Sequence, residues 1–433
     1  KEPTEGYDLH TTIDVNIQDI AHNALLNQLE KFDAEHGTVV VMEVETGAIK
    51  AIANLGRTNE GKYSEKYNYA VGETHEPGST FKLMGMIAAL EDKVIDIDTK
   101  IETGDGEMLF YGKYKVKDSK RGGYGTITAA KAFEVSSNVG LVKIVYDNYK
   151  NNPKQFVDRL YNMGIDKPLG LAIKGEGLPK IPHPSDIDWN GLHLPWMAYG
   201  YGVSLTPLQT LTFYNAIANG GEMVKPKFLE EISNFGNIPT KVFSKQILNP
   251  SICSKETLEK VRGMMFNVVD KKWGTGYSIK DPLLTMSGKT GTCQLDYTSE
   301  VIQYIASFVG YFPADQPKYS CIVVIHRPDK TKGYYGATVA APVFKSVAKK
   351  IFNDIPYQVN IKRSDLNLLT QKSQEFIFKT VPNVTGMLPD AARVKLEKIG
   401  FTVILKGEGK VKNQSIKPGV QIKVNQKITL DLS

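Results

Sequence analysis

The sequence predicts an α+β protein divided into one large unit and one small C-terminal unit. Three observations carry this prediction: a β-rich hairpin lies near the start, helical patterns fill the middle, and strands with a final helix close the large unit. The chain has 433 residues, which is more than one compact core usually holds, so two or three domains are expected. Its 41% hydrophobic and 23% charged residues exclude disordered, collagen-like and coiled-coil classes.

The N-terminal part is expected to run from an extended lead-in into a helix and then into a hairpin. Residues 1–15 are typical of extended chain, whereas apolar residues in 16–32 recur at helical spacing. Residues 37–56 contain two β-rich runs joined by Glu45-Thr46-Gly47, which is typical of a hairpin turn. Val39 to Met42 are continuously apolar, which indicates a buried strand.

The middle of the large unit is mostly helical in pattern, and strands return near its end. The clearest helical runs are 83–92, 128–148 and 206–219. Strands are predicted at 283–294, 304–312 and 319–326, and a helix at 338–353. We expect the first hairpin and these last strands to form one sheet flanked by the terminal helices.

A separate small α+β unit is predicted after a polar stretch. Residues 354–379 have no strong period, and from Val381 a helix (388–399) precedes strands at 401–406 and 421–432. The expected segments are a lead-in and first helix (1–34), a main domain (35–355), a linker (356–379) and a tail domain (380–433).

The charge and cysteine content exclude several classes of protein. The net charge is +6, and residues 380–433 hold nine of the basic and only four of the acidic residues. The main domain is therefore almost neutral, which argues against a nucleic-acid partner. No apolar run reaches the roughly 18–20 residues that span a bilayer, and no leader pattern is present. The three cysteines are too scattered for a zinc site or a disulfide scaffold.

Serine and lysine, rather than a histidine cluster, supply the candidate chemistry. A serine and a lysine at i and i+3 share a helix face, so the amine can reach the hydroxyl. Two such pairs occur, Ser79 with Lys82 and Ser346 with Lys349, and about two are expected by chance. The second pair lies in an amphipathic run, where a solvated face is the simpler interpretation.

The context of Ser79 distinguishes the first pair. Pro77 and Gly78 precede it and the run KLMGMIAAL follows, so Ser79 is predicted in the first turn of a helix. Free N–H groups there favour a developing negative charge. A plain N-cap serine with a surface lysine is the alternative on this pair alone.

Two further motifs favour catalysis. Ser136-Ser137-Asn138 is the only SxN in the chain, and Lys289-Thr290-Gly291 is the only K[ST]G. The order SxxK, SxN, KTG is the signature of penicillin-binding proteins and serine β-lactamases. Three motifs in this order, each on its expected element, make coincidence improbable.

The surrounding sequence resembles the transpeptidase domain of penicillin-binding proteins over roughly residues 10–355. The matching segments are HEPGSTFK (75–82), YGYGVSLTPLQTLTFYNAIANGG (199–221), GTG (274–276), SGKTGT (287–292), ASFVGYFPA (306–314) and AAPVF (340–344). The tail resembles a PASTA domain through VPNVTGM, GF and a later KPG. The lead-in TIDVNIQ resembles the junction after the pedestal of monofunctional, division-type class B proteins.

The resemblance implies a role for each motif residue. Ser79 would be the nucleophile, and Lys82 the base that takes its proton once its pKa is lowered. Ser136 would relay a proton to the leaving amine, and Asn138 would orient Lys82 and the substrate amide. Lys289 would support the field around Ser136 and the substrate carboxylate.

The strand that carries the third motif would bind substrate. Thr290 and Thr292 would hydrogen-bond the substrate carboxylate, and the N–H groups of Ser79 and Thr292 would form the oxyanion hole. Gly291 would let a substrate backbone lie against the strand, with a β-bulge as the alternative. Cys293 is expected to be a packed small hydrophobe.

The implied fold is the antiparallel sheet with flanking helices and a helical subdomain that penicillin-binding proteins share with serine β-lactamases. The implied activity is D,D-transpeptidation of peptidoglycan stem peptides through a Ser79 acyl-enzyme, with release of D-Ala and inhibition by β-lactams. No metal or organic cofactor is implied. The implied location is the cell envelope, with an N-terminal anchor and pedestal missing from this chain and division proteins as partners. A β-lactamase or penicillin-sensing domain, and a non-catalytic wall-binding scaffold, remain as alternatives.

Overall fold

The computed structural model of the protein describes residues 6–234, 238–295, 302–354, 381–397, 399–421 and 426–433. The chain forms two compact units, Lys1–Pro356 and Tyr357–Ser433. The predicted linker, 356–379, lies outside the described residues. In the described part of the chain, no helix combines the length and the apolar character needed to cross a membrane.

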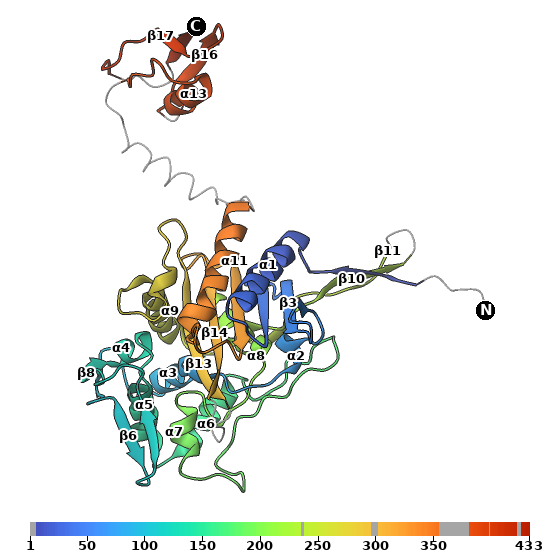
Figure 1. Cartoon of the computed structure of the whole chain (residues 1–433), viewed down its shortest axis with the longest axis vertical. Coiled ribbons are helices and arrows are strands. Elements are labelled where there is room, and N and C mark those ends of the chain that lie inside the picture. The colour runs from blue at the N-terminus through green and yellow to red at the C-terminus, as the bar shows by residue number, and fades with distance from the viewer. Residues whose placement is uncertain (1–5, 235–237, 296–301, 355–380, 398, 422–425) are drawn as a thin grey trace, which may run out of the picture. The chain divides into compact units, whose positions relative to one another are not determined.

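A six-stranded antiparallel sheet organises the large unit (Figure 1). Its strand order is β13-β14-β15-β2-β3-β4, so the first hairpin and the last strands share one sheet, as the sequence predicts. The strands are β2 (His36–Glu43), β3 (Ile49–Arg57), β4 (Tyr63–Ser64), β13 (Ser287–Leu295), β14 (Gln303–Phe312) and β15 (Tyr319–His326). Strand β13 is an edge of the sheet, which leaves one side of its backbone open to the helical part.

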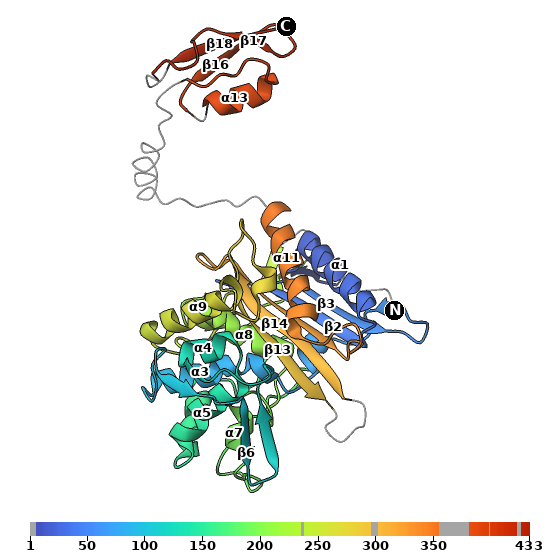
Figure 2. The same cartoon turned by 60° about the vertical axis from the view of Figure 1, so that its left-hand side comes forward.

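Helices cover both faces of this sheet, which is why β2 and β15 are buried almost throughout. The terminal helices α1 (Val15–Lys31) and α11 (Ala341–Asp354) pack side by side against one face (Figure 2). Helix α8 (Pro207–Ala218) packs against β14, β15 and β2, and all of its residues are buried. Thr206 begins α8 with a capping box to Gln209, and Pro207 stands at its first position, where no N–H is needed.

The helical part lies beside the open edge of β13. Its helices are α2 (Tyr69–Gly72), the 3₁₀ turn η1 (Gly78–Thr80), α3 (Lys82–Glu91), α4 (Ala129–Glu134), α5 (Asn138–Tyr149), α6 (Pro153–Asn162), α7 (His193–Met197) and α9 (Lys255–Asp270). Helix α3 is buried from Lys82 to Leu90 and therefore forms the centre of this part. Four short strands make two two-stranded sheets that the sequence did not indicate: β5 (Lys100–Glu102) with β8 (Thr126–Thr128), and β6 (Glu107–Phe110) with β7 (Tyr114–Lys117).

Short elements connect these layers. They are β1 (Asp8–Thr11), β9 (Met223–Val224), β10 (Leu229–Asn234), β11 (Ile238–Val242), β12 (Ile247–Asn249), η2 (Tyr277–Ile279) and α10 (Gly336–Val339). Strand β1, in the expected extended lead-in, pairs with β10, and β10 pairs with β11.

The predicted helical run 128–148 is wrong at its centre. Thr128 caps α4, Ser137 caps α5, and Ser136 between them adopts a left-handed backbone with φ of 58°. Ser137 accepts a hydrogen bond from the Gly140 amide, so the second motif begins a new helix. Ser79 also differs slightly from expectation, because it lies in η1, immediately before α3.

The C-terminal unit is a helix on a three-stranded sheet. Its elements are α13 (Pro389–Glu397), β16 (Thr402–Lys406), β17 (Val411–Gln414) and β18 (Lys427–Leu432), with strand order β16-β18-β17. Strands β16 and β18 run parallel, and β17 was not predicted. Part of the strand predicted at 421–432 lies outside the described residues. A separate apolar core includes Val384, Leu396 and Leu430.

Candidate active site

Three elements bring the sequence motifs together: the turn η1 with α3, the break between α4 and α5, and the edge strand β13. Lys82 is fully buried at the first position of α3. Its Nζ donates to the Ser136 carbonyl oxygen at 2.7 Å and to Asn138 Oδ1 at 2.6 Å, and it lies 3.2 Å from Ser136 Oγ. The first and second motifs are therefore joined through one amine.

The third motif reaches the same hydroxyl from the opposite side. Lys289, fully buried on β13, donates from Nζ to Ser136 Oγ at 2.8 Å and to the Thr290 carbonyl oxygen at 3.0 Å. The left-handed backbone of Ser136 is the feature that turns its hydroxyl between the two amines. Four predicted catalytic residues, Lys82, Ser136, Asn138 and Lys289, thus form one hydrogen-bonded cluster.

Burial makes these two amines weak bases. Loss of solvation lowers the pKa of Lys82 to about 7, although the nearby Asp118 carboxylate opposes this change. Burial, and then the charge of Lys82, hold the pKa of Lys289 well below its usual range. A neutral amine at Lys82 could accept the hydroxyl proton of Ser136 across the same 3.2 Å contact. The cluster can therefore hold and move a proton near neutral pH.

Asp118 positions the second motif, and sequence reasoning missed it. Its carboxylate accepts from Ser137 Oγ at 3.0 Å and from the Val139 amide at 3.0 Å, at the N-terminus of α5. The Asn138 side-chain amide donates to the Lys117 carbonyl oxygen at 2.7 Å, which fixes its Oδ1 toward Lys82. Asp118 lies in a polar loop before β8, and no short-range pattern in the sequence links Asp118 to the second motif.

The resemblance implies that β-lactams acylate Ser79, and on that expectation Asp118→Asn should slow the acylation about 10- to 100-fold, the range for losing one hydrogen bond to a charged group. Because the carboxylate raises the pKa of Lys82, its removal should also shift the acidic limb of the rate-against-pH profile to lower pH. Stopped-flow acylation across pH 5–9 measures both effects. The control is Asp105→Asn, where an exposed carboxylate accepts only from the Glu107 amide among the described contacts. An unshifted profile in Asp118→Asn would contradict the assignment.

Glycines let the Ser79 turn pack against its neighbours without side chains. A Cβ on Gly200 would lie 1.9 Å from the Gly78 carbonyl oxygen, and Gly78 itself has φ of 54° and would bring a Cβ 3.2 Å from the Thr292 carbonyl oxygen. The Gly78 amide donates to the Gly200 carbonyl oxygen at 3.1 Å. The segment around Gly200 therefore braces η1 from one side while β13 borders it on the other.

The structure gives Gly291 a packing reason in addition to the expected role in substrate binding, which stays a prediction. A Cβ there would lie 2.1 Å from Ser307 Oγ and 2.9 Å from Thr80 Cγ2, so the glycine lets the chain pack on itself. The alternative of a β-bulge is wrong, because the register between β13 and β14 is continuous.

The two threonines of the third motif are both engaged within the protein. The Thr290 and Thr275 hydroxyls are 2.7 Å apart, and Thr275 belongs to the GTG segment. Thr292 Oγ1 accepts from the Gly336 amide at 3.0 Å, which leaves its hydroxyl proton available to a substrate. Thr275 and Gly336 are thus supporting residues that motif spacing did not single out.

The remaining sequence predictions fall outside this cluster. Ser346 and Lys349 lie on α11, where Lys349 pairs with Asp281 at 2.9 Å, so the second SxxK is a surface pair as expected. Cys253, Cys293 and Cys321 are buried and form no disulfide with one another, and Cys293 is a packed side chain as predicted.

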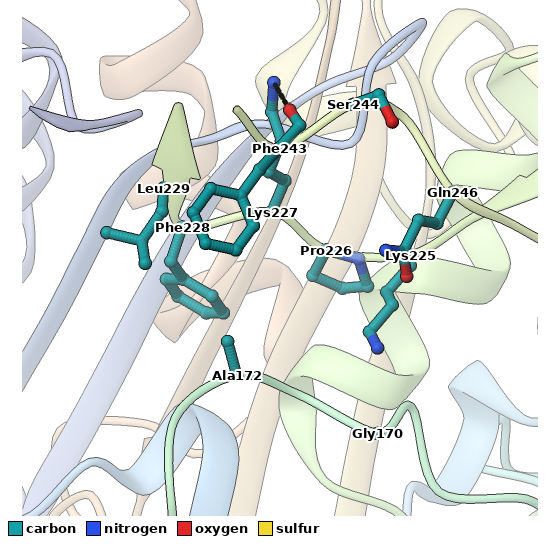
Figure 3. A pocket seen from close by; sticks show the side chains of 10 residues that line it. All are labelled: Gly170, Ala172, Lys225, Pro226, Lys227, Phe228, Leu229, Phe243, Ser244 and Gln246. Carbon is teal, nitrogen blue, oxygen red and sulfur yellow. Dashed lines mark hydrogen bonds between the residues drawn. The ribbon is translucent and has the colours of Figure 1, made fainter. Parts of the chain in front are cut away.

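A pocket elsewhere in the large unit contains none of the predicted site residues (Figure 3). It lies between the loop at 170–172 and the segments 225–229 and 243–246. Phe228 and Phe243 line it, and Lys227 Nζ donates to the Phe243 carbonyl oxygen at 3.3 Å. Its lining carries no group that resembles a nucleophile beside a base.

Comparisons with known proteins agree with both predicted resemblances. Residues 37–349 match the family model of the penicillin binding protein transpeptidase domain, and residues 379–433 match the PASTA domain model. The chain is 27% identical to stage V sporulation protein D of Bacillus subtilis over all of this chain and 66% of that protein. It is 26% identical to peptidoglycan D,D-transpeptidase FtsI of Buchnera aphidicola, over 80% of this chain and 59% of the relative.

A solved structure shows the same fold. Penicillin binding protein 3 of Mycobacterium tuberculosis, complexed with aztreonam, is similar with a TM-score of 0.69 and 25% identity, over 81% of this chain and 80% of that one. The chain spans 59–66% of the length of the two curated relatives, so it corresponds to part of each of them.

Proposed function

Because the chain belongs to the family of penicillin-binding protein transpeptidase domains, we propose that it is a serine D,D-transpeptidase that cross-links peptidoglycan stem peptides. One observation carries the proposal: Lys82 and Lys289 lie 3.2 and 2.8 Å from the Ser136 hydroxyl, next to the turn that holds Ser79. Burying two amines around one hydroxyl costs desolvation free energy, which a non-catalytic scaffold would have no reason to retain. Proton transfer explains why both amines are there.

We propose that acylation begins at Ser79. Its Oγ attacks the carbonyl carbon of the penultimate D-Ala, and its proton passes to neutral Lys82. The bond to the terminal D-Ala breaks, and that leaving amine takes a proton through Ser136, which the two lysines contact. An amine from a second stem peptide then attacks the ester, forms the cross-link and restores Ser79.

The edge strand β13 would hold the substrate in this scheme. An extended peptide can pair with an open strand edge, and Thr290, Gly291 and Thr292 lie on β13 beside η1. The N–H groups of Ser79 and Thr292 would stabilise the oxyanion, and Thr292 would donate to the substrate carboxylate. Lys289 would support Ser136, whose hydroxyl oxygen accepts a hydrogen bond from its Nζ.

The wider setting is proposed on the resemblance. The lead-in and the tail resemble those of class B proteins, and this resemblance supports a role in division at the cell envelope, with division proteins as partners. One relative is named as a peptidoglycan D,D-transpeptidase. The segments 1–34, 35–355, 356–379 and 380–433 would be the lead-in, the transpeptidase domain, the linker and the PASTA domain.

Incubation with a labelled penicillin should produce one covalent adduct, on the peptide that contains Ser79, that persists for many minutes. Intact-protein and peptide mass spectrometry measures it, with Ser79→Ala as the unlabelled control. No water-activating base stands in the proposed scheme, so the acyl-enzyme should hydrolyse slowly. Rapid return to the unmodified mass would indicate a β-lactamase instead, and failure of Ser79 to react would indicate a non-catalytic scaffold.

A further inference from the structure

A group of histidines and a glutamate lies behind the catalytic turn and takes no part in the scheme above. His36 on β2 and His326 on β15 are directly opposite each other in the antiparallel pairing, so their side chains point to the same face of the sheet. Their rings stack with centroids 4.2 Å apart. Glu73, in the segment between α2 and η1, reaches the same place from the helical part.

The potential ligand atoms converge. Glu73 Oε2 lies 2.9 Å from His36 Nε2 and 3.4 Å from His326 Nε2, and the ligand atoms of all three residues lie within 4.8 Å of one another. Ligand atoms on a tetrahedral ion with bonds of about 2.1 Å stand about 3.4 Å apart, which matches the distance between Glu73 and His326. The shorter distance between Glu73 and His36 is that of a hydrogen bond, which an ion would replace. Among the described residues, this is the one group of three such side chains that converges in this way.

A second observation is the state of His326. The residue is only 6% exposed, and its Nε2 is buried without a hydrogen-bond partner, although it faces Glu73. A buried ring nitrogen without a partner is costly, and binding to a metal would satisfy it.

The surroundings of the other histidine are a carboxylate and two rings. Glu35 Oε1 lies 3.6 Å from His36 Nδ1, on the side of the ring away from Glu73, which is longer than a hydrogen bond. The ring of Tyr69 stacks on His36 at 4.1 Å, and His75 packs edge-on against His326 at 5.2 Å.

We propose that His36, Glu73 and His326 form a binding site for a divalent transition-metal ion, and that this ion is Zn²⁺. Two imidazoles and one carboxylate suit such an ion and leave a position for water. The ion would tie β2 and β15 to the segment that continues through His75 to Ser79, and so would hold the catalytic turn against the sheet. Its role is structural, because none of the three residues contacts the lysine cluster.

Metal-free full chain should bind one equivalent of Zn²⁺ in calorimetry, and Co²⁺ as a probe should give visible d–d absorption of a four- or five-coordinate ion. Zn²⁺ at a hundredfold excess over its Kd should raise the unfolding midpoint of the large unit by about 4 °C. His326→Gln and Glu73→Gln should each weaken binding by at least about 100-fold. His10→Gln is the control, because His10 pairs with Glu231 at 3.7 Å in an exposed pair that lacks a second histidine.

Penicillin labelling at Ser79 confirms that each variant is folded before its metal affinity is compared. Should a variant fail to fold, anomalous diffraction at the zinc edge from crystals of the parent chain gives an independent reading, with a peak expected between the two Nε2 atoms. Three results would each overturn the proposal: no stoichiometric Zn²⁺ binding, a Zn²⁺ affinity in His326→Gln equal to that of the parent chain, or an anomalous peak only at another place. The three side chains would then form a hydrogen-bonded His–Glu–His cluster without a metal.

Discussion

Lys82→Met should slow the acylation of Ser79 by a labelled penicillin by at least about 1,000-fold while leaving the protein folded. General base catalysis contributes about 100- to 10,000-fold, and Lys82 stands one turn from Ser79 with its pKa lowered to about 7. Methionine fills a similar volume and removes the amine, so the buried position keeps its packing. Stopped-flow or gel-based acylation kinetics measures the change, and circular dichroism verifies the fold.

The second SxxK pair of the chain provides the matched control for this variant. Lys349→Met removes a lysine at the same spacing from a serine, on α11, where the half-exposed Lys349 forms its one described ion pair with the Asp281 carboxylate. We expect an unchanged acylation rate. Equal slowing in both variants would mean that the loss at Lys82 reflects general charge or stability rather than a base at the site.

The pH dependence of the parent protein tests the same assignment without a mutation. Burial lowers the pKa of Lys82 to about 7, and the proposed step needs its neutral form. The acylation rate should therefore rise as pH increases from 5, with a midpoint near 7, and level off above it. A rate that is flat or falls through this range would require a different base.

The sheet and the three motifs could be predicted because they depend on local pattern. Val39 to Met42 in the hairpin and 321–325 in the last strand are continuously apolar, and a strand buried on both faces needs that composition. Ser79, Ser136 and Lys289 were selected by order and spacing alone, and the structure brings their motifs together. The PASTA-like tail could likewise be predicted as a short separate unit, because its apolar residues follow a helical and then a strand pattern.

The parts that could not be predicted depend on contacts between distant segments. The break at Ser136 is hidden in an apolar run with helical character. Its left-handed backbone ends α4 through hydrogen bonds from the Ser136 and Ser137 amides to the Phe133 and Ala132 carbonyls. The contacts of Ser136 with Lys82 and Lys289 come from distant segments, which the sequence alone does not show. Asp118 contacts Ser137 across a loop of no particular pattern. Cross-strand alignment of His36 and His326 becomes visible only when β2 and β15 are paired.

Gly200→Ala should destabilise the large unit by about 3–5 kcal/mol and should also slow acylation of Ser79. The new Cβ would lie 1.9 Å from the Gly78 carbonyl oxygen, a contact that only a shift of backbone can relieve, and Gly200 has φ of 90°. That shift would move η1, which carries Ser79, away from β13. Urea unfolding and acylation kinetics measure the two effects.

Gly202→Ala is the control that separates two causes of lost stability in Gly200→Ala: the close contact of the new Cβ and the strain of a left-handed backbone. Gly202 has φ of 70°, and a Cβ there would meet no atom within 4 Å, so alanine should cost only about 1–2 kcal/mol through the left-handed backbone. Acylation in this variant should stay near the parent rate, because nothing pushes on the Ser79 turn. If both alanine variants lose the same stability and activity, the contact with Gly78 does not hold the nucleophile in place, and the positioning of Ser79 must then depend on α3 and β13 alone.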